Sequence, residues 1–249
     1  MKLYYNFHIH TCLSPCCEED MTPGNIVLMC KLCGFDAIAV TDHNSCRNCR
    51  AAVKAGEQQG LVVIPGMELT TSEDIHVICL FPDVQRAEGF DRLVTEGFPK
   101  YFPPDNIFGR QLIVDENDSI AGNVDYLLLT ASSIGVNQVK GIADSFGGFC
   151  FPAHVDRNGY GILSVLGAIP PEAGFTAVEL SGAFDERTGQ DVLARIAGFG
   201  VLHNSDAHSL YTIGEPVHAL DIAGDGPLSA PDIIAVLKAL RLNYTATKG

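Results

Sequence analysis

The chain of 249 residues has no tryptophan and few basic residues: 16 lysines and arginines stand against 30 aspartates and glutamates. The formal net charge of −14 repels a nucleic-acid backbone at long range, and no run of lysines and arginines offsets it locally. We therefore expect that the chain does not bind duplex nucleic acid.

Long apolar runs are also missing. No stretch is long enough to cross a bilayer, and Met1–Phe7 has the pattern of a strand rather than of a charged and then apolar leader. We expect no membrane association and a cytoplasmic location. Cysteine, by contrast, occurs nine times, and an odd number without an export signal argues for reduced thiols rather than a disulfide framework.

Short apolar runs alternate with helical stretches, in a composition that is 47% hydrophobic and 18% charged. The pattern predicts strands near 3–9, 37–40, 61–64, 76–81, 149–154, 177–180 and 201–204, and helices near 22–32, 48–59, 138–147, 188–197 and 230–240. Thr22 and Pro23 are typical of a helix start, and Gly34 of its end. Strands that alternate with helices indicate parallel βα units, as in a βα barrel.

Residues 83–135 interrupt this rhythm. They contain the turn-rich run Phe102-Pro103-Pro104-Asp105-Asn106 and a predicted hairpin, with a first strand at Gln111–Val114 and a turn at Asp115–Asp118. We interpret the segment as an insertion or cap over the barrel mouth, within a single domain that spans residues 1–249.

Histidines and carboxylates gather at the predicted carboxyl ends of the strands, where a βα barrel places its catalytic groups. They are His8, His10, Asp42, His43, Glu68, His154, Asp206 and His208. His76 departs from this rule, because it opens its strand, so we expect the adjoining turn to bring it in. A single histidine of this kind is more often structural than functional, but the joint pattern predicts a metal site.

Imidazole and carboxylate ligands together suit zinc, manganese or iron, and more than four of them imply more than one ion. Adjacent divalent ions lower the pKa of a bridging water to give hydroxide near neutral pH and hold phosphoryl oxygens during in-line attack. The pattern therefore favours a hydrolase of phosphoesters that needs no serine or cysteine nucleophile.

Five short stretches carry a specific resemblance. They are His8-Ile9-His10-Thr11, Thr41-Asp42-His43-Asn44, Pro65-Gly66-Met67-Glu68, Pro152-Ala153-His154 and Asn204-Ser205-Asp206-Ala207-His208. In type and order they resemble the motifs of the PHP (polymerase and histidinol phosphatase) superfamily. The resemblance implies an α/β fold, a distorted (β/α)7 barrel related to the TIM barrel, here with the insertion near residues 83–135, and a trinuclear centre of two or three divalent ions.

The same resemblance implies a ligand set. One ion would take His8, His10, Glu68 and Asp206; a second would take His43 and His208; a third would take Glu68 as a bridge, His76 and His154. Asp42 would not bind an ion but would orient a neighbouring ligand. His203 and His218 are left with structural or surface roles.

The loop after the first motif departs from the family pattern, which commonly places an aspartate or histidine ligand there. This chain offers Cys16 or Glu18 instead. For the substrate phosphate we expect a further cation, Arg157 before Arg187. The alternative for Arg157 is an ordinary loop ion pair with Asp156 or Glu186.

Two cysteine pairs have the spacing of a zinc or iron–sulfur site, Cys30 with Cys33 and Cys46 with Cys49. A buried strand between the pairs places them at opposite ends, which disfavours a shared ion. Cys46 and Cys49 could instead share the barrel mouth with Cys16 and Cys17 as redox-responsive thiols.

These patterns favour a metal-dependent phosphoesterase that acts on a small phosphorylated substrate, a phosphomonoester or a nucleotide. The enzymatic alternative is an exonuclease on short oligonucleotides, whose groove would need basic and aromatic residues that this chain has few of. A non-catalytic, regulatory metal-binding module is the other alternative, against which the complete ligand set argues. Oligomeric state is not readable from the sequence.

Overall fold

A computed structural model describes residues 1–103, 107–223, 226, 228–240 and 247–248. Its main sheet has seven strands in the order β11-β10-β1-β2-β3-β4-β7. Their bounds, in that order, are Thr247–Lys248, His218–Asp221, Lys2–Asn6, Ala37–Val40, Val62–Thr70, His76–Leu80 and Phe149–Pro152. A parallel pair, β8 (Ala177–Ser181) and β9 (Gly200–Asn204), forms a separate two-stranded sheet.

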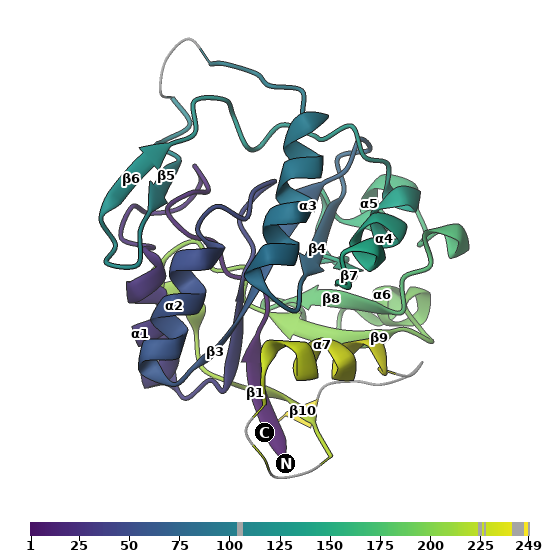
Figure 1. Cartoon of the computed structure of the whole chain (residues 1–249). Coiled ribbons are helices and arrows are strands. Elements are labelled where there is room, and N and C mark those ends of the chain that lie inside the picture. The colour runs from purple at the N-terminus through teal and green to yellow at the C-terminus, as the bar shows by residue number, and fades with distance from the viewer. Residues whose placement is uncertain (104–106, 224–225, 227, 241–246, 249) are drawn as a thin grey trace.

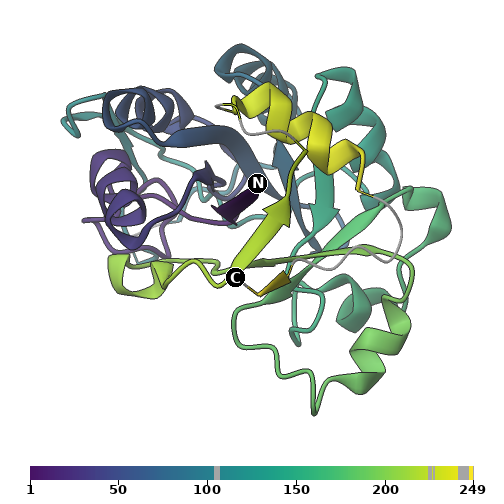
Figure 2. The ribbon, with the colours of Figure 1, turned by 90° about the horizontal axis from the view of Figure 1, so that it is seen from below.

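Helices lie around the outside of the strands, as the view from below shows (Figure 2). They are α1 (Pro23–Cys33), α2 (Cys49–Gln59), α3 (Val84–Glu96), α4 (Val136–Ser145), α5 (Ile162–Leu166), α6 (Gln190–Arg195) and α7 (Ala230–Lys238), with short 3-10 turns η1 (Pro171–Ala173) and η2 (Leu210–Ile213). None of the helices in the described ranges is both long and apolar enough to cross a membrane.

The strands curl so that the chain segments after β1 and β9 meet. Ile9 bridges Ala207 in parallel register, and the His10 N–H donates to the Ala207 carbonyl at 3.0 Å. The Phe7 N–H donates to the side chain of Asn204 at 2.7 Å. The sheet therefore closes at the carboxyl ends of its strands, and the prediction of a distorted α/β barrel is confirmed.

The distortion lies in the strand directions. β4 runs antiparallel to both β3 and β7, and β10 runs antiparallel to β1. The register pairs Thr70 at the end of β3 with His76 at the start of β4. A residue that opens an antiparallel strand lies at the carboxyl ends of its neighbours, which explains why His76 opens its strand and still faces the barrel mouth.

β3 is longer than the predicted strand, because it continues through Pro65 and Gly66 to Thr70. A β-carbon at Gly66 would lie 2.8 Å from the Cys79 carbonyl oxygen and 2.9 Å from a methyl of Thr41. Glycine therefore lets the neighbouring strands approach closely just before Glu68.

Helix α1 begins and ends where the sequence predicts. The Thr22 side chain accepts a hydrogen bond from the Asn25 N–H, and Gly34 ends the helix with a left-handed φ of 93°. Asp118, at the tip of a hairpin, accepts hydrogen bonds from the Thr22 hydroxyl at 2.6 Å and the Gly24 N–H at 3.0 Å. This carboxylate ties the hairpin to the start of the helix.

Segment 83–135 contains two different parts. Helix α3 buries Ala87, Phe90 and Val94 in the main core, while the predicted hairpin is formed by β5 (Leu112–Val114) and β6 (Ile120–Asn123). The hairpin lies above α1 and α2 (Figure 1). Residues 104–106 of the predicted insertion lie outside the described part, and the single-domain organisation over 1–249 stays a prediction.

Candidate metal centre

The structure brings all eight predicted metal ligands to one end of the barrel. They come from six chain segments: His8 and His10 follow β1, His43 follows β2, Glu68 lies in β3, His76 opens β4, His154 follows β7, and Asp206 and His208 follow β9. Except for His208 and the edge of His76, their side chains are almost wholly buried.

Glu68 lies at the middle of this group. Five imidazole nitrogens, from His8, His10, His43, His76 and His154, lie between 2.8 and 3.3 Å from its two oxygens. Both oxygens are buried, yet no donor in the described part of the chain is aligned to hydrogen-bond with either. Buried polar atoms of this kind need a partner, and a cation shared with the imidazoles would provide it.

One cluster has a complete set of ligand atoms. His8, His10, Glu68 and Asp206 each place a ligand atom within 4.8 Å of the others. The Nε2 atoms of His8 and His10 both lie 3.1 Å from the same Asp206 oxygen. This is the set that the family resemblance gives to one ion, and its role as a ligand set remains a proposal.

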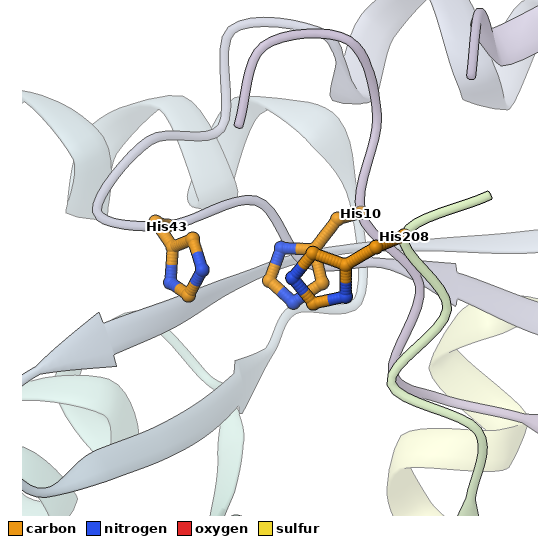
Figure 3. A group of neighbouring side chains, drawn as sticks. All are labelled: His10, His43 and His208. Atoms are coloured by element: carbon orange, nitrogen blue, oxygen red, sulfur yellow. The ribbon is translucent and has the colours of Figure 1, made fainter. Parts of the chain in front are cut away.

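Two other clusters of potential ligands share residues with each other and differ from the predicted second and third ligand sets. His10, His43 and His208 form one, and His43, Glu68 and His76 form another. Figure 3 shows the first, with His43 on one loop and His10 and His208 on two others. The His10 ring lies 4.4 Å, between centroids, from each of the other two. His43 thus belongs to both clusters and would offer a ligand atom to an ion held at either.

Hydrogen bonds at the back of the rings set which nitrogen faces the cluster. The His8 Nδ1 lies 3.0 Å from Glu179, and the His208 Nδ1 lies 2.8 Å from the Asp206 carbonyl oxygen. Both partners only accept, so each Nδ1 carries the proton and each Nε2 keeps its lone pair for a cation. The residues therefore fit the divalent ions that the family resemblance implies.

The charges of the site favour cations. Burial alone would lower the pKa of His8 and His43, because it disfavours the charged ring. The neighbouring acidic groups outweigh burial: Glu179, Asp206 and Glu68 raise the pKa of His8 well above its ordinary value, and Glu68 with Cys16 raises the pKa of His43 to about 10. The field that attracts these protons also attracts divalent ions.

Asp42 does not touch the cluster directly. It accepts hydrogen bonds at 2.7 Å from the Thr11 N–H, the Thr11 hydroxyl and the Ser14 hydroxyl. The Ser14 oxygen in turn lies 3.1 Å from the Nδ1 of His10. Asp42 therefore orients His10 through Ser14, which supports the positioning role that we predicted rather than direct contact with substrate.

Glu179, on β8, is a site residue that the sequence reasoning missed. Its carboxylate is fully buried, contacts the His8 Nδ1, and accepts hydrogen bonds from the His154 N–H at 3.0 Å and the Asn204 side chain at 2.7 Å. The available signal was a carboxylate inside the apolar strand Ala177–Ser181. A buried charge of this kind is rare without a partner.

Two of the predicted ligands lie on strained backbone. His154 has φ of 29° and Asp206 has φ of 52°, values that residues with a β-carbon rarely adopt. Such conformations cost on the order of 1–3 kcal/mol each and are held by their surroundings. For His154 the hydrogen bond from its N–H to Glu179 supplies part of that support.

Arg157 points to the metal cluster and not to the loop acids that were its alternative partners. Its Nη1 lies 2.5 Å from Asp206 Oδ2, while Asp156 accepts hydrogen bonds from Ser181. Arg187 is 89% exposed and pairs with Asp185. Both arginines line a cavity of about 1090 Å³ that also borders Asn204 and Ser205, next to Asp206.

The two cysteine pairs lie apart, as predicted, but Cys46 and Cys49 are buried in the core and do not share the barrel mouth with Cys16 and Cys17. Cys46 and Cys49 lie in the core with their sulfurs 3.2 and 3.3 Å from the Gly66 carbonyl oxygen, and Cys30 lies in another core cluster. In the described ranges neither pair joins a group of potential metal ligands, whereas Cys16 and Cys17 do, together with His208. Cys17, then His208 and His43, lower the pKa of the Cys16 thiol to about 2.

The two remaining histidines stack on each other. The rings of His203 and His218 lie 4.0 Å apart at an angle of 6°, on the wall of the cavity. Their assignment to structural roles stays a prediction.

Solved structures with a similar fold include two endonucleases. A lesion-specific endonuclease from Pyrococcus furiosus has a TM-score of 0.67 at 15% identity, over 97% of this chain and 58% of its own. Endonuclease Q bound to a 27-mer duplex with an abasic lesion has a TM-score of 0.66 at 16% identity, over 96% of this chain and 57% of its own. The chain thus spans less than two thirds of their length.

A shorter neighbour matches end to end. A protein from Bifidobacterium adolescentis assigned as a metal-dependent phosphoesterase has a TM-score of 0.58 at 17% identity, over 94% of this chain and 95% of its own. A search of curated protein sequences finds no match. This neighbour shares the fold over nearly the whole of both chains.

The endonuclease complex corrects one expectation. We excluded duplex nucleic acid from the net charge of the chain, but a structure of the same fold holds a DNA duplex with the lesion at its active site. That exclusion is wrong, because net charge describes the long-range field, whereas bound cations and local groups decide the field at the site itself.

The sequence match is independent of these structural neighbours. The PHP domain model matches residues 6–147, which is more than half of the chain and contains the first three of the five motifs together with His76. The chain belongs to the PHP domain family.

Proposed function

We propose that this PHP-family protein is a metal-dependent phosphoesterase that hydrolyses a small phosphorylated substrate, a phosphomonoester or a nucleotide. The observation that carries the proposal is the convergence of five imidazoles on the buried Glu68 carboxylate, with Asp206 beside them. The donor set suits two or three ions of zinc, manganese or iron, in a trinuclear centre.

When bound, such ions supply activated water and neutralise charge on the phosphoryl oxygens. The chain's own residues do the rest. His8, His10, Glu68 and Asp206 hold one position, His43 and His208 hold another, and Glu68 reaches towards His76 and His154 at a third. Asp42 and Glu179 keep the rings turned so that a nitrogen lone pair faces the ions.

Arg157 is the residue we propose for binding the substrate phosphate. Its side chain is 43% exposed, contacts Asp206 and lines the cavity, so it can exchange this contact for a phosphate oxygen. We propose that the remainder of a substrate molecule extends from Arg157 into the same cavity, whose volume is about 1090 Å³ and whose lining includes none of the eight predicted metal ligands.

Cleavage of nucleic acid is the second candidate function, and the likeness to endonuclease Q over 96% of this chain favours it. The phosphodiester of an oligonucleotide presents the same phosphoryl oxygens to the same centre. An exonuclease on short oligonucleotides belongs to this class. A non-catalytic, regulatory metal-binding module is the remaining alternative.

One assay separates these functions. The metal-loaded protein is given a panel of phosphomonoesters and nucleotides, a single-stranded oligonucleotide, and a duplex with an abasic site. We expect metal-dependent phosphate release from the first set, lost in His10→Ala and Asp206→Ala and weakened mainly through KM in Arg157→Ala. Arg50→Ala, which removes an exposed pair with Glu88, is the control.

Cleavage of either nucleic acid without phosphate release would replace the first candidate by the second. Stable metal binding with no hydrolysis of any substrate would favour the regulatory module. We further propose a reducing compartment such as the cytoplasm, since all nine cysteines are free thiols.

A further inference from the structure

The loop after β1 holds two cysteines against the metal centre. Its backbone is fixed on both sides: the Cys17 N–H donates to the Ser14 carbonyl at 3.0 Å, and the Glu18 N–H donates to the His208 carbonyl at 3.1 Å. Ser14 is itself held by Asp42. The position of Cys16 relative to His208 is therefore set by the fold.

The two sulfurs have different surroundings. Cys16 is exposed, and its sulfur lies within 4.8 Å of a ring nitrogen of His208. Cys17 is half-buried and packs against the apolar cluster that contains Ile9 and Met21. Glu18, the alternative that the sequence offered, is exposed and belongs to none of the ligand clusters among the described residues.

The cation position at His43 and His208 has fewer carboxylates than the position at Asp206. Its cluster contains three imidazoles, from His10, His43 and His208, and no carboxylate. The adjoining cluster joins His208 to Cys16 and Cys17. A thiolate would supply an anionic ligand at this position, which otherwise has only imidazoles.

We propose that Cys16 binds, through its sulfur, the ion held by His43 and His208, which makes this position a mixed nitrogen–sulfur site. The proposal rests on the metal-dependent function above. A soft thiolate ligand shifts preference towards zinc and cadmium and away from manganese, which prefers oxygen. Ions of two kinds would then share the centre, with the oxygen-rich position at Glu68 and Asp206 free to hold manganese or iron.

Cobalt substitution tests the proposal without relying on activity. Tetrahedral Co²⁺ shows visible bands with any ligand set, whereas a thiolate ligand adds a sulfur-to-cobalt charge-transfer band in the near ultraviolet. We expect both in the wild type, loss of the near-ultraviolet band in Cys16→Ser, and its retention in Cys17→Ser. Cys33→Ser, a half-buried cysteine on α1, is the matched control.

A second variant, Cys16→Asp, replaces sulfur by oxygen at the same place. We expect its affinity for Cd²⁺ to fall roughly ten- to a hundredfold, which is the usual effect of removing a residue that orients a metal ligand. Its affinity for Mn²⁺ should be kept or raised. Competition with a chromophoric chelator measures both affinities.

Three results would overturn the proposal. Visible cobalt bands without a charge-transfer band would remove the thiolate and leave the metal-dependent function standing. A charge-transfer band that is lost in Cys17→Ser but kept in Cys16→Ser would show that Cys17, and not Cys16, is the sulfur ligand. Failure of the wild type to bind cobalt would remove both the thiolate site and the proposed function.

Discussion

Replacement of Glu179 by glutamine tests whether a residue that carries no predicted ligand atom controls the centre. The two side chains have the same shape, so the change leaves no cavity. In the wild type one oxygen accepts from the His154 N–H at 3.0 Å and the other from the Asn204 amide at 2.7 Å, and both lie within 3.1 Å of the His8 Nδ1.

Glutamine has only one acceptor oxygen. Whichever way its amide turns, the NH2 group faces a donor, from His154 or from Asn204, and the negative charge beside His8 is lost. A buried donor left without an acceptor costs about 1–3 kcal/mol. The two oxygens of Glu179 orient His8 and His154. We therefore expect the substitution to weaken metal affinity ten- to hundredfold, which corresponds to roughly 1.4–2.8 kcal/mol of binding free energy.

The assay is competition for Zn²⁺ with a chelator of known affinity, together with denaturant unfolding of the metal-free protein. Glu57→Gln makes the same chemical change at an exposed position of α2 and should alter neither quantity. A folded Glu179→Gln protein whose zinc affinity lies within about twofold of the wild type would refute the orienting role.

Three further predictions concern the fold and the charges of the site. Asp118→Ala should lower the free energy of unfolding by about 1–3 kcal/mol, because the Thr22 hydroxyl and the Gly24 N–H at the start of α1 lose their acceptor; urea unfolding against Asp118→Asn measures this. Phe90→Ala should lower the free energy of unfolding by about 3–5 kcal/mol, because Phe90 packs α3 into the core. An unchanged midpoint of urea unfolding would show that α3 is a peripheral cap. His43, with a pKa of about 10, must release its proton to bind an ion, so zinc affinity should rise with pH, by up to about tenfold per unit; an affinity independent of pH between about 6 and 9 would contradict this.

Much of the site could be predicted because a parallel βα unit delivers the residue after each strand to the same end of the sheet. This rule alone places His8, His43, His154 and Asp206. It fails for His76, since a strand's direction depends on its neighbours and leaves no mark in its own residues. β4 looks like any other apolar strand, and only its pairing with β3 and β7 shows that it is reversed.

Other features depend on contacts that no single segment contains. Glu179 reads as a lone carboxylate in a strand until β1 places His8 against it. The short strand β10 was not predicted, because its four residues form a strand through antiparallel pairing with β1. The exclusion of duplex nucleic acid failed for a similar reason, since it summed charge over the chain instead of locating it.

Metal content is the most direct test of the central claim, that these histidines and carboxylates form a multinuclear metal centre. The protein is purified without added metal and analysed by elemental mass spectrometry beside Asp206→Ala and His10→Ala. We expect about two or more transition-metal ions per wild-type chain and a clear loss in both variants. A folded wild-type protein that neither retains metal nor binds zinc, manganese or iron when they are added would contradict it.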